Sequence, residues 1–209
     1  FETDSRIKYI YSEKNGGFGY GNNRGIEIAK GDYLFLLNSD TLLVNNAIEE
    51  FFKYATSNSL RTIYGCYLQG PDGTYRDSFF YFPAFTIKDF LKRLVKPHNY
   101  KPDYTDKEVE CICGADMFMP KIAIEEAGMF DENIFLYGEE GELQYRMMKK
   151  GYKRMIITSP KIIHLEGESS SNTARSIYGM QSHFYILKKY MDPITYRLAK
   201  FYYKIRMSK

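Results

Sequence analysis

One carboxylate in this sequence stands where ligand chemistry is expected. The apolar run Tyr33-Leu34-Phe35-Leu36-Leu37 ends abruptly in Asn38-Ser39-Asp40. A charge inside a sheet is costly unless it is paired or binds a metal. At the carboxyl end of a strand in an α/β sheet, a carboxylate faces the crevice where ligands bind. We therefore predict that Asp40 contacts a ligand, although it could instead cap the next turn through Thr41.

Further groups able to do chemistry occur in the second half of the sequence. Glu139, Glu140 and Glu142 open a predicted helix over residues 139–150, and His164 closes a predicted strand over 153–164. Acids in a first helical turn commonly stabilise the helix dipole, and the dipole also keeps them ionised. A carboxylate there is either structural or a general base available at neutral pH. A histidine at a sheet edge is either hydrogen-bonded or a metal ligand.

A glycine-rich turn, Gly19-Tyr20-Gly21-Asn22-Asn23-Arg24-Gly25, has two interpretations. It stands between a predicted strand and a predicted helix, as the turn of a dinucleotide-binding fold does, with Asp40 roughly 20 residues downstream as the ribose-binding acid. The spacing differs from G-x-G-x-x-G, so a tight turn whose glycines permit positive φ and close packing explains it as well.

The elements that must position these groups alternate between strands and helices. Strands are predicted at 6–11, 32–38, 62–68, 110–119 and within 153–164, a hairpin at 74–82, helices at 22–29, 47–55, 85–95, 121–127, 139–150 and 176–191, and a loop at 96–106. Alternation followed by a hairpin predicts a mixed sheet in one α/β domain.

Composition narrows the class of protein. A length of 209 residues fits one domain, with or without appendages, and a net charge of +3 is too small to indicate nucleic-acid binding. The three cysteines lack C-x-x-C spacing, which favours free thiols in a reducing compartment over a zinc site. No signal peptide or apolar run of membrane-spanning length is present.

Four motifs in order carry a family resemblance: Gly-Phe-Gly-Tyr-Gly-Asn-Asn, Leu-Asn-Ser-Asp-Thr, the stretch 130–143 (FDENIFLYGEEGEL) followed by Arg146, and Ile-His-Leu-Glu-Gly-Glu-Ser. From about residue 7 to 170 the sequence resembles the family 2 glycosyltransferases, especially the rhamnosyltransferase-like branch. The resemblance implies a GT-A-like α/β/α fold with a mostly parallel mixed sheet in residues 1–170, followed by a helical, basic and aromatic extension in 171–209. It also implies metal-dependent, inverting sugar transfer.

The resemblance implies roles for individual residues that match the family's motifs by position. Asp40 matches the final Asp of the family's metal-binding D-x-D motif, whose first position is Asn38 here. Glu140 matches the expected base, with one methylene more than the usual Asp, and His164 matches a late metal ligand. The resulting assignment is catalytic Glu140; donor-binding Asn38, Asp40, Gly21 and Asn22; acceptor-binding Glu139 and Asp116; metal-binding Asp40 and His164. Asp116 could instead merely face solvent.

The implied cofactor is Mn²⁺ or Mg²⁺, and imidazole ligation would favour Mn²⁺. The implied partners are a nucleoside diphosphate sugar and a saccharide or lipid-linked saccharide acceptor, with no nucleic acid, in the cytoplasm or at the inner face of the membrane. The basic and aromatic tail could lie on anionic lipid or pack as a solvated helix.

The family's usual first strands, which hold the nucleobase, are not in the sequence. We therefore expect several dozen further residues upstream, on the order of two strands and one helix. Two rival functions remain at this point: a nucleotide-cofactor oxidoreductase built on the glycine turn, and a non-catalytic sugar-binding module with a degenerate site.

Overall fold

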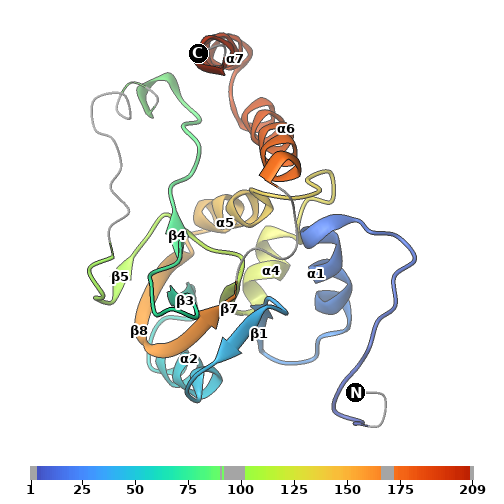
Figure 1. The fold of residues 1–209 in the computed structure, drawn as a ribbon, viewed down its shortest axis with the longest axis vertical. Coiled ribbons are helices and arrows are strands. Elements are labelled where there is room, and N and C mark those ends of the chain that lie inside the picture. Colours follow the sequence, from blue (N-terminus) through green and yellow to red (C-terminus); the bar gives the residue numbers. More distant parts are fainter. Residues whose placement is uncertain (1–3, 90, 92–101, 166–171, 208–209) are drawn as a thin grey trace.

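The structure, a computed structural model, describes residues 4–89, 91, 102–165 and 172–207, without the side chains of 172–176 and 205–207. Figure 1 shows the elements. The helices are α1 (Gly17–Ile28), α2 (Ala47–Thr56), α4 (Lys121–Ala127), α5 (Glu139–Lys149), α6 (Asn172–Tyr190) and α7 (Pro193–Met207). The strands are β1 (Tyr33–Leu37), β2 (Thr41–Leu43), β3 (Thr62–Gln69), β4 (Phe79–Phe80), β5 (Lys107–Glu108), β6 (Cys111–Ile112), β7 (Asp116–Pro120) and β8 (Lys153–His164).

The main sheet is mixed. Its strand order is β1-β7-β3-β8-β2, with β5 paired to β8, and β4 and β6 form a separate pair. The expectation of mostly parallel pairing is wrong for the described strands, because among them only β3 and β8 run parallel. The antiparallel pairs β1–β7 and β2–β8 each join strands that are far apart in the sequence, so the residues of one strand alone do not indicate its pairing direction.

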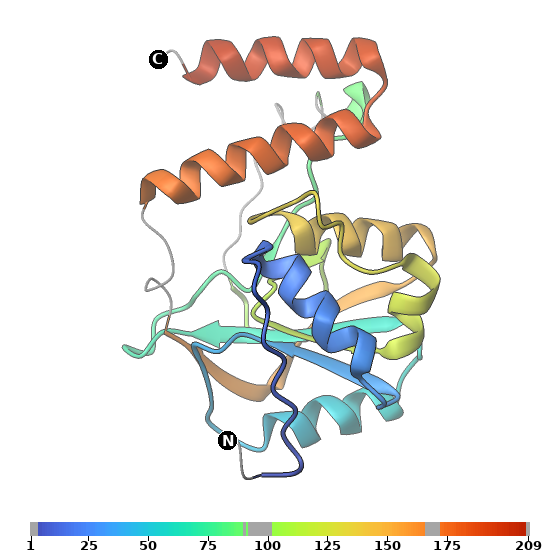
Figure 2. The same ribbon diagram turned by 90° about the vertical axis from the view of Figure 1, so that its right-hand side faces the viewer.

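Helices cover both faces of the sheet, which confirms the predicted α/β/α layering. Figure 2 shows α2 on one face and α1, α4 and α5 on the other, with α6 and then α7 stacked beyond α5. One buried cluster, which includes Ile63, Met117 and Leu143, fills the space between the sheet and the α1–α4–α5 layer. A second, which includes Phe51 and Phe118, fills the α2 side. Both clusters hold the strand ends rigidly, so they position the groups at those ends.

Helix α1 begins earlier than the sequence predicts. The predicted start was Asn22 or Asn23, but the helix begins at Gly17 and includes the glycine-rich turn. The cost of helical glycines is offset by close packing: a Cβ on Gly19 would lie 2.9 Å from the Cβ of Phe130. Gly17 has φ +86°, and there is no space for a side chain at this position, because a Cβ would lie 1.8 Å from the Phe135 carbonyl oxygen.

The predicted strand over residues 6–11 is wrong. These residues form no strand and are exposed, with Tyr9 80% and Tyr11 73% accessible. An extended segment needs a partner to supply its backbone hydrogen bonds, and none of the described strands pairs with this one.

Two other predictions are corrected and several are confirmed. The predicted strand over 110–119 is divided into β6 and β7 by the turn at residues 113–115, and residues 74–82 pair with β6 through β4 rather than mainly with β3. Of the predicted helix over 85–95, residues 87–89 and 91 are helical, and of the predicted loop over 96–106, residues 102–106 form neither helix nor strand; residues 90 and 92–101 lie outside the described residues. Strands β1, β3 and β8 and helices α2, α4 and α5 are confirmed, and the helix predicted over 176–191 is α6, after which α7 begins at Pro193.

Candidate functional site

The end of β1 brings Asp40 and His164 together. Asn38 is fixed by its backbone N–H, which donates to the Ala115 carbonyl at 3.0 Å. The next residues turn into β2, where Thr41 pairs in register with His164 at the end of β8. As a result His164 Nε2 lies 3.4 Å from Asp40 Oδ1. His164 is buried and the Asp40 side chain is 33% exposed, so the pair opens to solvent on the Asp40 side.

This pair fits a divalent cation as a partial ligand set. Two ligands at right angles around Mg²⁺ stand about 3 Å apart, close to the separation of these two atoms. Within the described residues, no group of three or more His, Cys, Asp or Glu side chains could hold a metal ion. The remaining positions would therefore belong to water and to oxygens of a ligand, as is usual for Mg²⁺ at phosphate sites.

Glu139 and Glu140 begin α5 after a strained turn. Tyr137 has φ +69° and Gly138 has φ +95°, so the chain reverses tightly before the helix. The Gly138 N–H donates to Glu140 Oε2 at 3.2 Å. Glu139 is buried, 4% exposed, and its Oε2 has no hydrogen-bond partner within the described part of the chain. Glu140 is only half-buried, so it is the accessible member of the pair.

Burial raises the pKa of both carboxyls. Burial, followed by repulsion from Glu140, raises the pKa of Glu139 to about 9. Burial also raises the pKa of Glu140 above its usual value, against the opposing effect of backbone N–H groups at the helix start. The sequence predicted that the helix dipole keeps these two carboxyls ionised. Burial opposes the dipole and favours the protonated form of both. Burial and mutual repulsion therefore favour retention of a proton by this pair of carboxyls.

The residues just before β7 connect the Asp40 loop to Glu140. Ala115 accepts the Asn38 hydrogen bond, and its neighbour Gly114 packs between Phe18 and Glu140. A Cβ on Gly114 would lie 3.2 Å from Phe18 Cζ and 3.6 Å from the Cβ of Glu140. The strand end that carries Asp40 and the helix end that carries Glu140 therefore belong to the same edge of the α/β body.

Glu140 also lines a cavity that the sequence did not reveal. The cavity has a volume of about 330 Å³, and its walls include Phe82, Phe85, Tyr137 and His183. Burial lowers the pKa of His183. The aromatic residues come from the 80–85 segment, from the turn before α5 and from α6, whose spacing predicts only helix packing. No sequence signal separates wall residues of this kind from core residues.

Gly21 and Asn22, predicted to bind the donor, line a groove of about 550 Å³ between α1 and β1 that extends to Leu37, next to Asn38. A Cβ on Gly21 would meet nothing within 4 Å. Their role in donor binding stays a prediction. The glycine turn of a dinucleotide fold is not formed, because these glycines lie inside α1.

Asp116 lies inside the sheet rather than at its surface. It is 0% exposed, and Oδ2 accepts the Cys66 backbone N–H at 2.7 Å. Burial raises the pKa of Asp116 to about 7. The solvent-facing interpretation is therefore wrong. Acceptor binding by Asp116 stays a prediction, and it requires an opening that the described residues do not form around this carboxyl.

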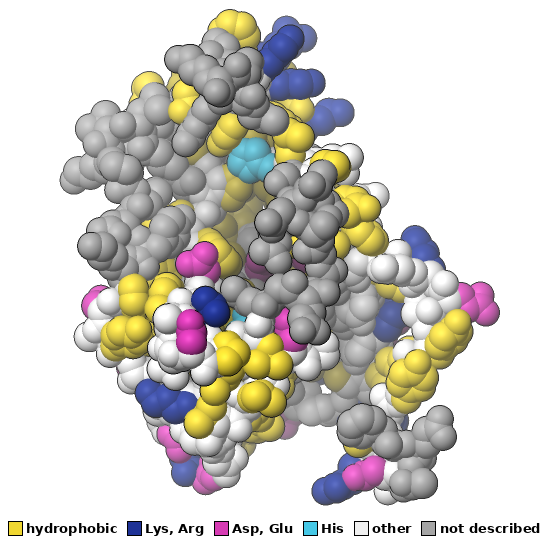
Figure 3. Space-filling view, in the orientation of Figure 1, with side chains coloured by type: hydrophobic (Ala, Val, Ile, Leu, Met, Phe, Trp, Pro, Cys, Tyr) yellow, Lys and Arg dark blue, Asp and Glu magenta, His cyan; other side chains and the backbone are white. Residues whose placement is uncertain are grey.

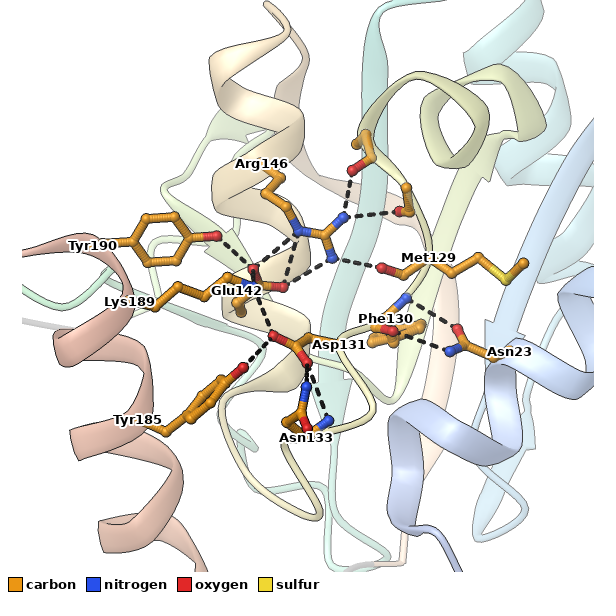
Figure 4. Close-up of polar contacts among 12 residues, drawn as sticks. Asn23, Met129, Phe130, Asp131, Asn133, Glu142, Arg146, Tyr185, Lys189 and Tyr190 are labelled. Carbon is orange, nitrogen blue, oxygen red and sulfur yellow. Dashed lines mark hydrogen bonds and ion pairs between the residues drawn. The ribbon is translucent and has the colours of Figure 1, made fainter.

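Glu142 belongs to a polar clamp, drawn in Figure 4, that fixes the loop before α5. Its buried carboxylate accepts bonds from Arg146, Lys189 and Tyr190. Burial tends to raise the pKa of Glu142, but these bonds outweigh it and lower the pKa. Arg146 also donates to the carbonyls of residues 127–129, and Lys189 reaches Asp131 at 2.6 Å. Of the two roles open to the acids of this helical turn, the contacts of Glu142 support the structural one.

Comparisons with known proteins point to one family. The sequence model described as "Glycosyl transferase family 2" matches residues 1–126. Glycosyltransferase GlyG of Streptococcus pneumoniae is 30% identical over 87 residues, which is 42% of this chain and 28% of that protein. A Bacillus subtilis glycosyltransferase, TuaG, whose name assigns it provisionally to teichuronic acid biosynthesis, is 31% identical over 96 residues, 45% of this chain and 38% of that protein. The matches thus span less than half the length of these relatives.

A solved structure shares the fold. The crystal structure of GalNAc-T7 with UDP, GalNAc and Mn²⁺ superposes with a TM-score of 0.63 at 12% sequence identity, over 87% of this chain and 37% of that one. At this identity the likeness establishes the GT-A architecture alone. The family match covers more than half of the chain, and the chain therefore belongs to glycosyl transferase family 2.

Proposed function

We propose that this chain transfers a hexosyl or deoxyhexosyl group, with inversion, from a nucleoside diphosphate sugar to a hydroxyl of a saccharide or lipid-linked saccharide. The observation that carries the proposal is the meeting of Asp40 and His164, which are distant in sequence, at 3.4 Å beside the end of β1. The rhamnosyltransferase-like branch, the sugar and the nucleotide remain proposals of the same kind. The name of TuaG supports synthesis of a surface polysaccharide.

The donor side of the reaction is assigned to the loop after β1. Asp40 and His164 would hold Mn²⁺ or Mg²⁺, which when bound neutralises negative charge on a leaving diphosphate. Asn38 presents its side chain from the same loop, and Gly21 leaves the groove beside β1 open to a ligand. Since a diphosphate leaves without protonation, the chain needs no second, acidic carboxyl for this step.

The acceptor side is assigned to the start of α5. Glu140 would take the proton of the attacking hydroxyl, because it is the accessible carboxylate of the pair and lines the aromatic cavity. A raised pKa makes it a stronger base, since the best base has a pKa near the working pH. Glu139, kept neutral by burial, would orient the acceptor or the Glu140 side chain. One base acting on an attacking hydroxyl suits direct displacement, and so inversion.

We propose that the reaction takes place in the cytoplasm, either free or at the inner face of the membrane. Cys66, Cys111 and Cys113 are free, as expected for a reducing compartment. No helix within the described residues is long and apolar enough to cross a bilayer.

A donor screen tests the proposal. Nucleotide release from UDP-, TDP- and GDP-sugars with Mn²⁺ is measured for the wild type, Glu140→Gln and the matched control Glu139→Gln. Loss of the base should lower kcat by about 10² or more with nearly unchanged donor affinity, and Glu139→Gln should be milder. Binding of a donor without turnover by any variant would instead indicate the non-catalytic sugar-binding module. Binding of NAD in place of UDP or TDP would favour the alternative function, a nucleotide-cofactor oxidoreductase.

A further inference from the structure

Helix α7 presents two exposed rows of side chains with different chemistry. The first row is apolar: Ile194, Leu198 and Phe201 are 72%, 53% and 65% exposed. They are four and three residues apart, so they share one face of the helix. The second row is basic and exposed: Arg197, Lys200 and Lys204, again three and four residues apart.

The opposite side of α7 is already occupied. Ala199 is buried, and the Tyr203 ring packs edge-on against His183 and Phe184 of α6, at centroid distances of 4.9 and 5.9 Å. Asp192 caps the helix start by accepting the Thr195 N–H at 3.0 Å. The helix is therefore anchored with its apolar and basic rows facing outward. Figure 2 shows α7 as the outermost element, with α6 between it and the α/β body.

We infer that these two rows form a docking surface for an anionic phospholipid bilayer. An amphipathic helix with apolar and Lys/Arg side chains lies in the membrane interface, bound by both its apolar area and its charge. Charge complementarity selects this occupant: the sequence from 193 to 209 contains no Asp or Glu. Figure 3 shows Lys and Arg side chains gathered beside hydrophobic ones at this end of the molecule. The inference goes beyond sugar transfer and does not require turnover.

Vesicle sedimentation tests it. The probes are phosphatidylcholine vesicles with and without about a third phosphatidylglycerol. The wild type should sediment with the anionic vesicles only, and binding should weaken as salt rises from about 0.1 M to about 1 M, where screening shortens to roughly 3 Å. Lys200→Gln with Lys204→Gln should lower the partition coefficient about thirtyfold, because each cation near such a surface is worth about a fivefold change.

A second pair of variants tests the apolar row. Leu198→Ser with Phe201→Ser should lower the partition coefficient at least about tenfold. The control, Leu42→Ser with Phe52→Ser, changes side chains of β2 and α2 that are 53% and 49% exposed, and it should bind as the wild type does. All four positions are exposed, so folding should survive, and circular dichroism checks that.

Three results would overturn the inference. The first is absence of wild-type binding to the anionic vesicles. The second is equal partitioning by the wild type and the Leu198/Phe201 variant. The third is a wild-type dimer in light scattering that this variant converts to a monomer without any vesicle binding, which would assign the face to a second copy of the chain. None of these outcomes depends on whether the protein transfers a sugar.

Discussion

Replacing Asp116 by asparagine should make the protein more stable at pH 8 but leave it nearly unchanged below pH 4. The carboxyl is fully buried, and burial raises its pKa from 3.8 to about 7. Below pH 4 the folded and unfolded chains both hold the proton, so the residue costs nothing. Between pH 4 and 7 only the unfolded chain ionises, so the free energy of unfolding falls as pH rises. Above pH 7 both states ionise and the loss is constant.

The pKa difference sets the size of this effect. A shift from 3.8 to about 7 corresponds to about 4 kcal/mol, and compact unfolded states reduce it, so 2 to 4 kcal/mol is expected as an order of magnitude. Asparagine keeps the shape and an oxygen to accept the Cys66 N–H. The Cys66 thiol stays neutral over this range, because burial raises its pKa well above the usual value.

Urea unfolding of the wild type and Asp116→Asn at several pH values between 4 and 8 measures the difference. The control Asp32→Asn, at an exposed position before β1, reports the effect of net charge alone. If the difference in free energy of unfolding between the wild type and Asp116→Asn stays the same from pH 4 to pH 8, the argument that folding raises the pKa of the Asp116 carboxyl is refuted.

Three further predictions follow from the site and its supports. Turnover should rise with pH on the acid side because the pKa of Glu140 is raised, and Glu140→Gln should abolish that dependence; an unchanged acid limb in this variant would exclude Glu140 as the base. Arg146→Ala should destabilise by about 3 to 5 kcal/mol, since it leaves Glu142 buried with a partner removed, whereas Lys53→Ala, at an exposed ion pair, should cost less than about 1 kcal/mol; equal effects in chemical denaturation would contradict the clamp. Gly17→Ala should destabilise by more than about 1 kcal/mol, because φ is +86° and the Phe135 carbonyl occupies the space, whereas Gly25→Ala, with open space in the same helix, should stabilise by about 0.5 to 1 kcal/mol; a Gly17→Ala melting temperature at or above that of the wild type would show the turn to be relaxed.

The parts of the fold that follow local rules could be predicted from the sequence. Gly128 and Gly151 end α4 and α5 with φ +83° and +86°, as glycines after a helix commonly do. The apolar run before Asn38 forms β1, and its polar end carries Asp40 as expected. These features depend on a few neighbouring residues, so sequence patterns capture them.

The predictions that were wrong concern features that depend on residues distant in the sequence. The direction in which two strands pair depends on how the intervening chain brings them together. The antiparallel pairing of β7 with β1 is therefore not visible in the sequence of either strand alone. The early start of α1 depends on Phe130 and Phe135 filling the space beside its glycines. Asp116 resembles a surface acid in sequence, and only the packing around it shows that its carboxyl is buried.

The candidate site, too, could be predicted from the sequence only in part. Motif positions identified Asp40, Glu140 and His164, and the structure brings Asp40 and His164 together. The cavity beside Glu140 was not predicted, because its wall joins α6 and the 80–85 segment only through the tertiary fold. The protonation of the glutamate pair also needs the structure, since burial of Glu139 decides it.

Calorimetric titration of UDP and TDP against the wild type and Asp40→Asn, with and without Mn²⁺, tests the central claim most directly. Asparagine keeps the shape of the side chain and removes the charge that would hold the cation. The account predicts that Mn²⁺ strengthens nucleotide binding to the wild type and that Asp40→Asn weakens the Mn²⁺-dependent binding by about tenfold or more, roughly 1.4 kcal/mol. Equal Mn²⁺-dependent affinity in the two proteins would contradict the assignment of Asp40 to a metal-assisted donor site.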